Sequence, residues 1–80
     1  MATVIFSSGL RPLVDGLEQL EIDATRVVDL TNALVERFPA LKPQLEQMAV
    51  AIDGQIHNDA RFQPLQPSSE VHFVPKIGGG

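Results

Sequence analysis

The segment MAVAIDGQIH, residues 48–57, decides the fold because it carries the strongest local folding signal in the sequence. From Met48 to Ile52 the larger apolar residues occupy every second position, which is the alternation of a β-strand. Asp53-Gly54 follows, and this dipeptide favours the positive φ angles of a two-residue hairpin turn. We therefore predict a β-hairpin in which residues 55–57 form the returning strand.

Two more strands are predicted near the N-terminus. Residues 3–7 have a composition typical of strands, and residues 17–23 alternate so that Leu20 and Ile22 share one face. Residues 10–14 lie between them and are expected to form a loop with apolar anchors. The two strands are therefore expected to pair as an antiparallel hairpin with a long loop.

One main helix is predicted over residues 25–38. Thr25 is a suitable N-cap, and Pro39 ends the helix because proline disfavours helical geometry in the residue before it. One or two further helical turns are expected around Pro43. Apolar side chains at helical spacing form a single stripe, which comprises Val27, Leu30, Leu34 and Phe38.

The last strand is predicted at residues 70–75. Val71 and Phe73 share one face and are assigned to the core, whereas His72 and Val74 lie on the other face and point outward. Because exposed apolar patches often mark interaction sites, His72 and Val74 are candidates for a docking surface.

Together these elements predict an α+β fold. Strands near both ends of the chain, with a helix between them, indicate a mixed sheet of four to five strands over one main helix. Phe62, in the irregular segment before the last strand, is expected to anchor that segment in the core. We expect one folded domain over residues 1–76, followed by a flexible C-terminal glycine tail at residues 77–80.

Composition limits the possible functions. The chain has no cysteine and only two separated histidines, which excludes disulfides and thiolate zinc sites and disfavours any metal site. Ten acidic residues against six basic ones give a net charge of −4, which disfavours nucleic-acid binding. No apolar run approaches the roughly 20 residues of a membrane span, and the N-terminus lacks a secretory pattern. We therefore expect a soluble, cytoplasmic protein.

No catalytic constellation is evident. There is no serine in a nucleophile turn and no phosphate-binding loop motif. The carboxylate pairs Glu36 with Glu46 and Asp53 with Asp59 are more simply interpreted as solvated surface charge. A domain of this size also has little room for a water-excluding pocket, so a self-contained enzyme is not expected.

The C-terminal end is the segment that indicates chemistry. The last predicted strand leads into Gly78-Gly79-Gly80, which are half of the six glycines in the chain. Glycine has no Cβ, so its backbone can enter a channel too narrow for other residues. Residues 77–80 span about 13–14 Å when extended, at about 3.3–3.6 Å per residue. The segment is therefore suited to present the Gly80 carboxylate to another protein.

The ending EVHFVPKIGGG, residues 70–80, resembles the C-terminal signature of the MoaD/ThiS family of ubiquitin-like sulfur carriers. In that family an ending of the type E-V-x-F-hydrophobic-P-P-V-A-G-G is typical. Two residues depart from it, because Lys76 and Gly78 stand where proline and alanine are common.

The resemblance extends in order along nearly the whole chain. Residues 4–6 and 10–16 are similar to the first strand and L-R-x-x-x-G loop of the molybdopterin synthase small subunit, whose pattern is the nearest. Residues 25–38, which run into a familiar F-P-A-L, resemble the family helix. Residues 49–56 resemble its V-x-V-N-G-x-x hairpin.

The resemblance implies a β-grasp (ubiquitin-like) fold and a carrier protein that is not itself an enzyme. The Gly80 carboxylate would be adenylated by an E1-like adenylyltransferase, which would use the ATP and magnesium, so this chain would bind no cofactor. A sulfurtransferase or cysteine desulfurase would then supply the sulfur of a C-terminal thiocarboxylate. A sulfur-accepting synthase subunit would consume it in molybdopterin, thiamine, cysteine or secondary-metabolite biosynthesis, and the pathway stays open.

The expected site consists of Gly80 as the reactive residue and a set of residues that contact partners. That partner-binding set comprises Gly78, Gly79, Ile77, Pro75, Val74 and His72. Two alternative functions remain compatible with the sequence. The first is a ubiquitin-like protein modifier conjugated through its C-terminal glycine, and the second is a plain β-grasp interaction module.

Overall fold

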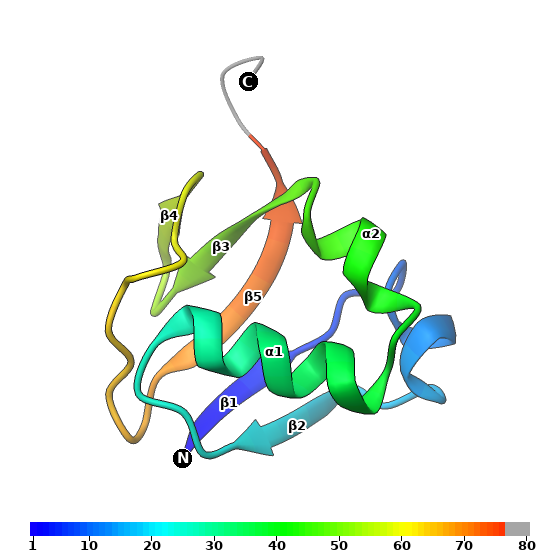
Figure 1. Ribbon diagram of the computed structural model, residues 1–80, viewed down its shortest axis with the longest axis horizontal. Helices are drawn as coiled ribbons and strands as arrows, with labels where there is room; N and C mark the ends of the chain where they lie inside the picture. The colour runs from blue at the N-terminus through cyan, green and yellow to red at the C-terminus, as the bar shows by residue number, and fades with distance from the viewer. Residues whose placement is uncertain (77–80) are drawn as a thin grey trace.

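Five strands form one mixed sheet in the order β2-β1-β5-β3-β4 (Figure 1). The computed structural model describes residues 1–76. Strands β1 and β5 are parallel, and the other neighbouring strands pair antiparallel, which confirms the predicted mixed sheet. The strands are β1 (Ala2–Ile5), β2 (Gln19–Ile22), β3 (Met48–Ile52), β4 (Gln55–His57) and β5 (Glu70–Pro75).

The last strand of the chain lies in the middle of the sheet. β5 is parallel to β1 on one side and antiparallel to β3 on the other, with Val71 opposite Val4 and Phe73 opposite Val50. β1 holds one edge of β5 as far as His72, and β3 holds the other edge as far as Pro75, so the fold fixes the direction of this strand.

The main helix α1 (Val27–Arg37) covers one face of the sheet, and the shorter α2 (Leu41–Leu45) follows it (Figure 1). All four residues of the predicted stripe are buried, from Leu30 at 0% exposed to Phe38 at 9%. They belong to one core cluster with Val4 of β1 and Val71 of β5. Full burial of each such side chain contributes about 1.5–3 kcal/mol to folding, so this aliphatic layer stabilises the domain.

The prediction that Thr25 caps the helix through its side chain is wrong. Arg26 is the N-cap residue, and no side chain caps this end of α1. Instead, the Val27 and Val28 N–H groups donate to the carbonyl oxygens of Gln63 and Arg61, at 3.1 and 2.8 Å. A distant loop therefore satisfies helix N–H groups that a capping side chain would otherwise satisfy.

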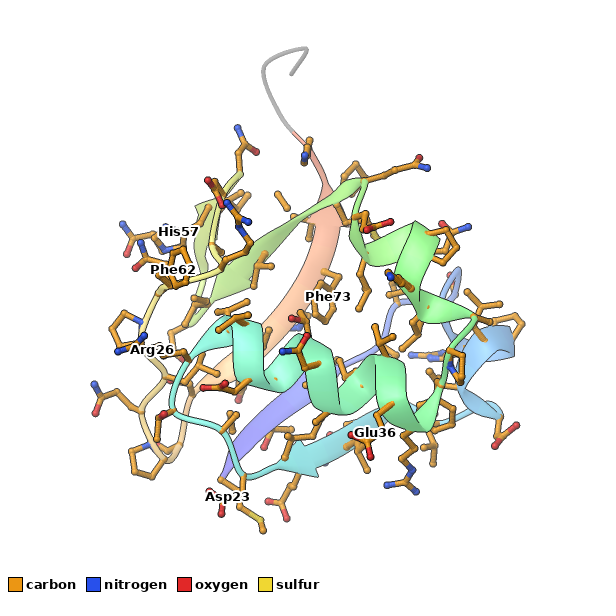
Figure 2. All side chains as sticks on the ribbon, in the orientation of Figure 1. Asp23, Arg26, Glu36, His57, Phe62 and Phe73 are labelled. Carbon is orange, nitrogen blue, oxygen red and sulfur yellow. The ribbon has the colours of Figure 1, made fainter. Side chains whose placement is uncertain are left out.

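The prediction that Phe62 anchors its segment in the core is also wrong, because its side chain is 69% exposed (Figure 2). The residues on either side of it turn their carbonyl groups to the start of α1, and the Arg61 guanidinium lies 5.6 Å from the Phe62 ring centre. Ala60 and Leu65, at 5% and 7% exposed, are the apolar residues that hold this segment to the core.

Two turns with positive φ angles shape the connections. Asp53 and Gly54 have φ angles of 49° and 86°, which confirms the hairpin turn predicted between β3 and β4. Residues 10–14, expected to be a loop, include a short 3-10 helix, η1 (Arg11–Val14). Its end at Asp15 is left-handed, and Leu10 and Val14 are buried as the expected anchors.

Candidate functional site

Strand β5 divides its side chains between the two faces of the sheet, as the alternation predicts. Val71 and Phe73 are 0% and 3% exposed and belong to the core, and Figure 2 shows Phe73 on the side of β5 that carries the helices. His72 and Val74 lie on the opposite face and are half-buried. Pro75, at the end of the strand, is exposed.

The helix-free face of the sheet brings His72 and Val74 together with residues from three other strands. His72 is opposite Ile5 on one side and Ala51 on the other, and Val74 is opposite Ala49. Residues opposite each other on neighbouring strands project from the same face, so these side chains form one surface. We call this surface the outer patch. Its accessible members are Ile5, Ile56, His72 and Val74, and it also includes Ala49 and Ala51, which are buried at 0% and 8% exposed.

Sequence reasoning identified only the β5 members of the outer patch. Ile56 is opposite Ala51 and is 46% exposed, yet a three-residue strand gives little indication of which side chain faces solvent. For Ile5, the sequence indicates only that it belongs to a strand over residues 3–7. The period-two alternation was a usable signal for both residues, but only the register between strands shows that they share a face with His72.

Charge is distributed unevenly along β5. At its start, the Glu70 N–H donates to Asp53 Oδ1 at 2.9 Å, and the Asp53 N–H donates to the Glu70 carbonyl oxygen at 2.9 Å. At its other end, Val74 and Pro75 are apolar and lie opposite Ala49 and Met48. The apolar end of the outer patch is therefore the end from which the chain continues to residues 77–80.

The reactive and tail residues predicted from the sequence lie outside the described residues. These are Ile77, Gly78, Gly79 and Gly80. The structure brings together the other predicted site residues, His72, Val74 and Pro75, on the strand that leads to them.

The carboxylates considered as catalytic pairs have separate contacts. Asp53 bonds to the backbone of Glu70, whereas Asp59 Oδ1 pairs with Arg61 Nε at 3.4 Å on the surface. Across residues 1–76, no three His, Cys, Asp or Glu side chains gather in a group that could hold a metal ion. In the same part of the chain, no helix has both the length and the apolar character that crossing a bilayer requires.

A groove of about 650 Å³ opens on the helix side of the sheet. Residues of α1, α2, β3 and the segment after β4 line it, together with Phe73 and Lys76. The volume falls in the usual range of ligand sites, about 300–1,000 Å³. The groove is open to solvent, so it does not provide a water-excluding catalytic site.

Comparison with protein families gives one match over almost the entire chain. The model described as the ThiS family matches residues 4–80. No curated protein matches the sequence.

Solved structures with a similar fold were found at low sequence identity. The small archaeal modifier protein 1 from Methanosarcina acetivorans has a TM-score of 0.81 and 22% identity, covering 99% of this chain and 95% of that one. A chain of the Amycolatopsis orientalis BexX/CysO complex has a TM-score of 0.84 and 16% identity, covering 100% of both chains. A protein from Pyrococcus furiosus described as molybdopterin converting factor, subunit 1, has a TM-score of 0.78 and 21% identity, covering 95% and 97%. These likenesses establish the β-grasp, ubiquitin-like fold.

Proposed function

This chain belongs to the ThiS family, and from that premise we propose that it is a sulfur carrier whose reactive group is the carboxylate of Gly80. The observation that carries the proposal is the family match over residues 4–80, which runs through the three glycines that follow the central strand. We propose that the chain acts as a co-substrate in the cytoplasm and not as an enzyme.

The chemistry follows from the properties of a carboxylate. A carboxylate is a poor acyl electrophile because its charge is delocalised and its leaving group would be oxide. An E1-like adenylyltransferase would join the Gly80 carboxylate to AMP, using ATP and magnesium and releasing pyrophosphate. The cofactors of this step would belong to the partner, and this chain would bind none.

Sulfur would enter at the activated carbonyl carbon of Gly80. The persulfide of a sulfurtransferase or cysteine desulfurase would attack that carbon and expel AMP, which leaves an acyl disulfide between the two proteins. A thiol would then cleave the sulfur–sulfur bond by forming its own disulfide with the departing sulfur. The product is a thiocarboxylate at Gly80, and a sulfur-accepting synthase subunit would use it as the sulfur donor.

The outer patch is the surface that we propose for docking to these partners. It is apolar where β5 ends, so a partner bound there would lie next to the start of the tail. Pro75 and Ile77 would brace the tail, and Gly78 and Gly79 would pass through the partner's channel because they have no side chain. A similar chain has been solved within a complex, the BexX/CysO assembly, which supports a carrier that works through partners.

The proposal is tested by intact-mass spectrometry of the protein isolated from the cells that make it. The expected result is a species heavier by the difference between sulfur and oxygen, which disappears when Gly80 is deleted. If the protein isolated from these cells carries only an ordinary carboxylate at Gly80, the carrier proposal fails.

The second candidate is a ubiquitin-like protein modifier. It is favoured by the likeness to small archaeal modifier protein 1. Both functions begin with adenylation, but in a modifier the attacking group is a lysine amine and the product is an isopeptide bond. Conjugates of higher mass that contain this chain would support the modifier, whereas the sulfur-bearing species supports the carrier.

A third candidate is a plain interaction module that uses the fold alone. Deletion of Gly79 and Gly80 distinguishes this candidate from the other two, because only a plain interaction module would keep its full binding activity without these residues. The pathway that receives the sulfur is open among molybdopterin, thiamine, cysteine and secondary-metabolite biosynthesis. Isolation of the bound partner from the host would identify it.

A further inference from the structure

Strand β2 is an edge of the sheet, because β1 is its only neighbour among the strands of residues 1–76. Figure 1 shows it at the border of the sheet, on the side of β1 that faces away from β5. An open edge carries main-chain N–H and C=O groups without a partner strand, and these groups can pair with an extended segment of another chain. This edge is distinct from both the outer patch and the groove.

The register identifies which main-chain groups of β2 are open. The Phe6 N–H donates to the Glu18 carbonyl oxygen at 2.9 Å. Hydrogen-bonded and non-bonded pairs alternate along an antiparallel ladder, so Gln19 and Glu21 turn their N–H and C=O groups away from β1. Thr3 agrees with this alternation, because it is opposite Glu21 and donates its own N–H to the residue that precedes β5. The N–H and C=O groups of Gln19 and Glu21 therefore face the open edge.

The side chains of β2 divide between the two faces of the sheet. Leu20 and Ile22 are half-buried against the core on the helix side. Glu21 is exposed on the opposite face, where Thr3 separates it from Glu70 of β5. An added strand that alternates apolar and basic residues would place apolar side chains beside Leu20 and Ile22 and a basic one beside Glu21.

Charge around this edge is mainly negative. Residues 15–23 contain no basic residue and four acidic ones, which are Asp15, Glu18, Glu21 and Asp23. Arg11, whose Nε donates to the Phe6 carbonyl oxygen at 3.2 Å, brings one positive charge to the start of β2, and the amino group of Met1 brings another to its end. Residues 26–37, which include α1, add no net charge, since two basic residues balance two acidic ones. Within residues 1–76, none of the four carboxylates at this edge forms an ion pair.

We propose that the edge of β2 binds an extended basic segment of a partner protein, which adds to the sheet antiparallel to Gln19–Ile22. Antiparallel pairing is slightly more stable than parallel pairing. A second copy of this chain is a poor occupant, because pairing two β2 edges would bring their carboxylates together. Short, charged edge strands protect a sheet against self-pairing in this way, and the same charge favours a basic chain.

The proposed segment would not cover the tail. β1 and β2 separate it from β5, so a partner held at this edge would leave the end of β5 available to other proteins. The inference therefore goes beyond the proposed function and does not rest on it.

The test uses the full isotope-labelled chain and a capped peptide in which lysines alternate with valines. A titration gives the dissociation constant, and amide hydrogen exchange measures the protection of each residue. At a peptide concentration about ten times that constant, exchange at Gln19 and Glu21 should slow about tenfold, because only about one molecule in eleven is then free. Exchange at Ile56, on the β4 edge, should not change.

The peptide itself supplies a matched control. In an antiparallel pair with basic side chains beside Glu21, the N–H groups of the lysines face β2 and those of the valines face away. N-methylation of the lysines should therefore abolish the protection, whereas N-methylation of the valines should leave it intact. Both changes keep the charge and the side chains.

Variants of the protein test the two kinds of contact separately. Gln19→Pro removes an outward N–H without changing the charge, and proline is tolerated on edge strands where its nitrogen faces solvent. This variant should fold and lose the peptide. Glu21→Gln should weaken binding by up to about fivefold, the range of an exposed ion pair. Glu46→Gln removes the same charge beside the groove on the helix side and should bind normally.

Unchanged exchange at Gln19 and Glu21 would overturn the proposal, as would binding that survives N-methylation of the lysines. Protection of Ile56 in their place would overturn it in favour of the β4 edge. Protection that grows with protein concentration without peptide would overturn it in favour of a second copy. Deletion of Gly79 and Gly80 should leave peptide binding unchanged. Failure here therefore leaves the sulfur-carrier proposal intact, and failure of the mass-spectrometric test leaves strand addition intact.

Discussion

The two faces of β5 differ although their residues alternate along a single strand. Val71 and Phe73 are sealed beneath the helices, whereas His72 and Val74 remain half-exposed on a face that no helix covers. One residue step thus separates side chains that hold the fold together from those that we propose meet a partner. We therefore predict that stability and partner binding can be altered independently in this strand, and the following experiments probe how complete that separation is.

The buried face should show the largest effect. Phe73→Ala removes a core side chain that is 3% exposed, and such truncations cost about 3–5 kcal/mol of unfolding free energy. That loss is a large part of the stability of a small domain, about 5–15 kcal/mol. Denaturant unfolding measures it, with Val74→Ala as the neighbouring control, which should lose less. Equal losses for the two variants would break the comparison.

The second experiment extends the comparison beyond the strand to the tail. Gly79→Leu should leave unfolding unchanged but lower the rate of adenylation about 100-fold, since small misplacements of a reacting group cost that much. ATP–pyrophosphate exchange with the activating enzyme measures the rate. Gly9→Leu is the matched control, because Gly9 has open space around it and lies far from the tail in sequence. Normal activation of Gly79→Leu would contradict the narrow-channel idea.

The outer face should show a smaller effect, confined to binding. Val74→Glu places a charge in the outer patch, and docking to the activating enzyme should weaken about tenfold because that charge would lose its water on binding. Titration calorimetry measures the dissociation constant. Gln44→Glu adds the same charge at an exposed position of α2, on the helix side of the sheet, and should bind normally. If both variants bound equally well, the outer patch would not be the docking surface.

The smallest effect is expected at Phe62. Because this ring is 69% exposed, Phe62→Ala should change the unfolding free energy by less than about 0.5 kcal/mol. Leu65→Ala, at a buried position in the same segment, should cost about 2–5 kcal/mol. Thermal or denaturant unfolding compares the two variants. A large loss at Phe62 would mean that the segment is anchored as the sequence first suggested.

Local patterns were sufficient to predict much of the fold. The Asp53-Gly54 turn, the stripe of α1 and the alternation of β5 each depend on residues close together in the chain, so the sequence displays them directly. The family resemblance then supplied the topology that joins these elements, and the solved structures agree with it.

The features that sequence reasoning missed all depend on contacts between distant segments. From the local sequence Thr25 is a plausible N-cap. In the structure, the carbonyl groups of Arg61 and Gln63 accept the first N–H groups of α1 instead. Ile5 and Ile56 join the outer patch only through the register of β1, β5, β3 and β4. The groove on the helix side likewise requires α1, α2 and the segment after β4 to be placed together, which no local pattern specifies.

The central position of β5 has a consequence for how the protein is made. A ribosome synthesises Glu70–Pro75 last among the strands, yet β1 and β3 both pair with it and not with each other. A nascent chain that has not reached this strand therefore lacks the element that joins the two hairpins into one sheet. Because β1 and β5 pair residues such as Thr3 and Glu70, which lie far apart in the sequence, the sheet closes only after β5 has been made. Interruption of translation before this strand would consequently yield unfolded fragments, open to proteases, in place of a folded domain.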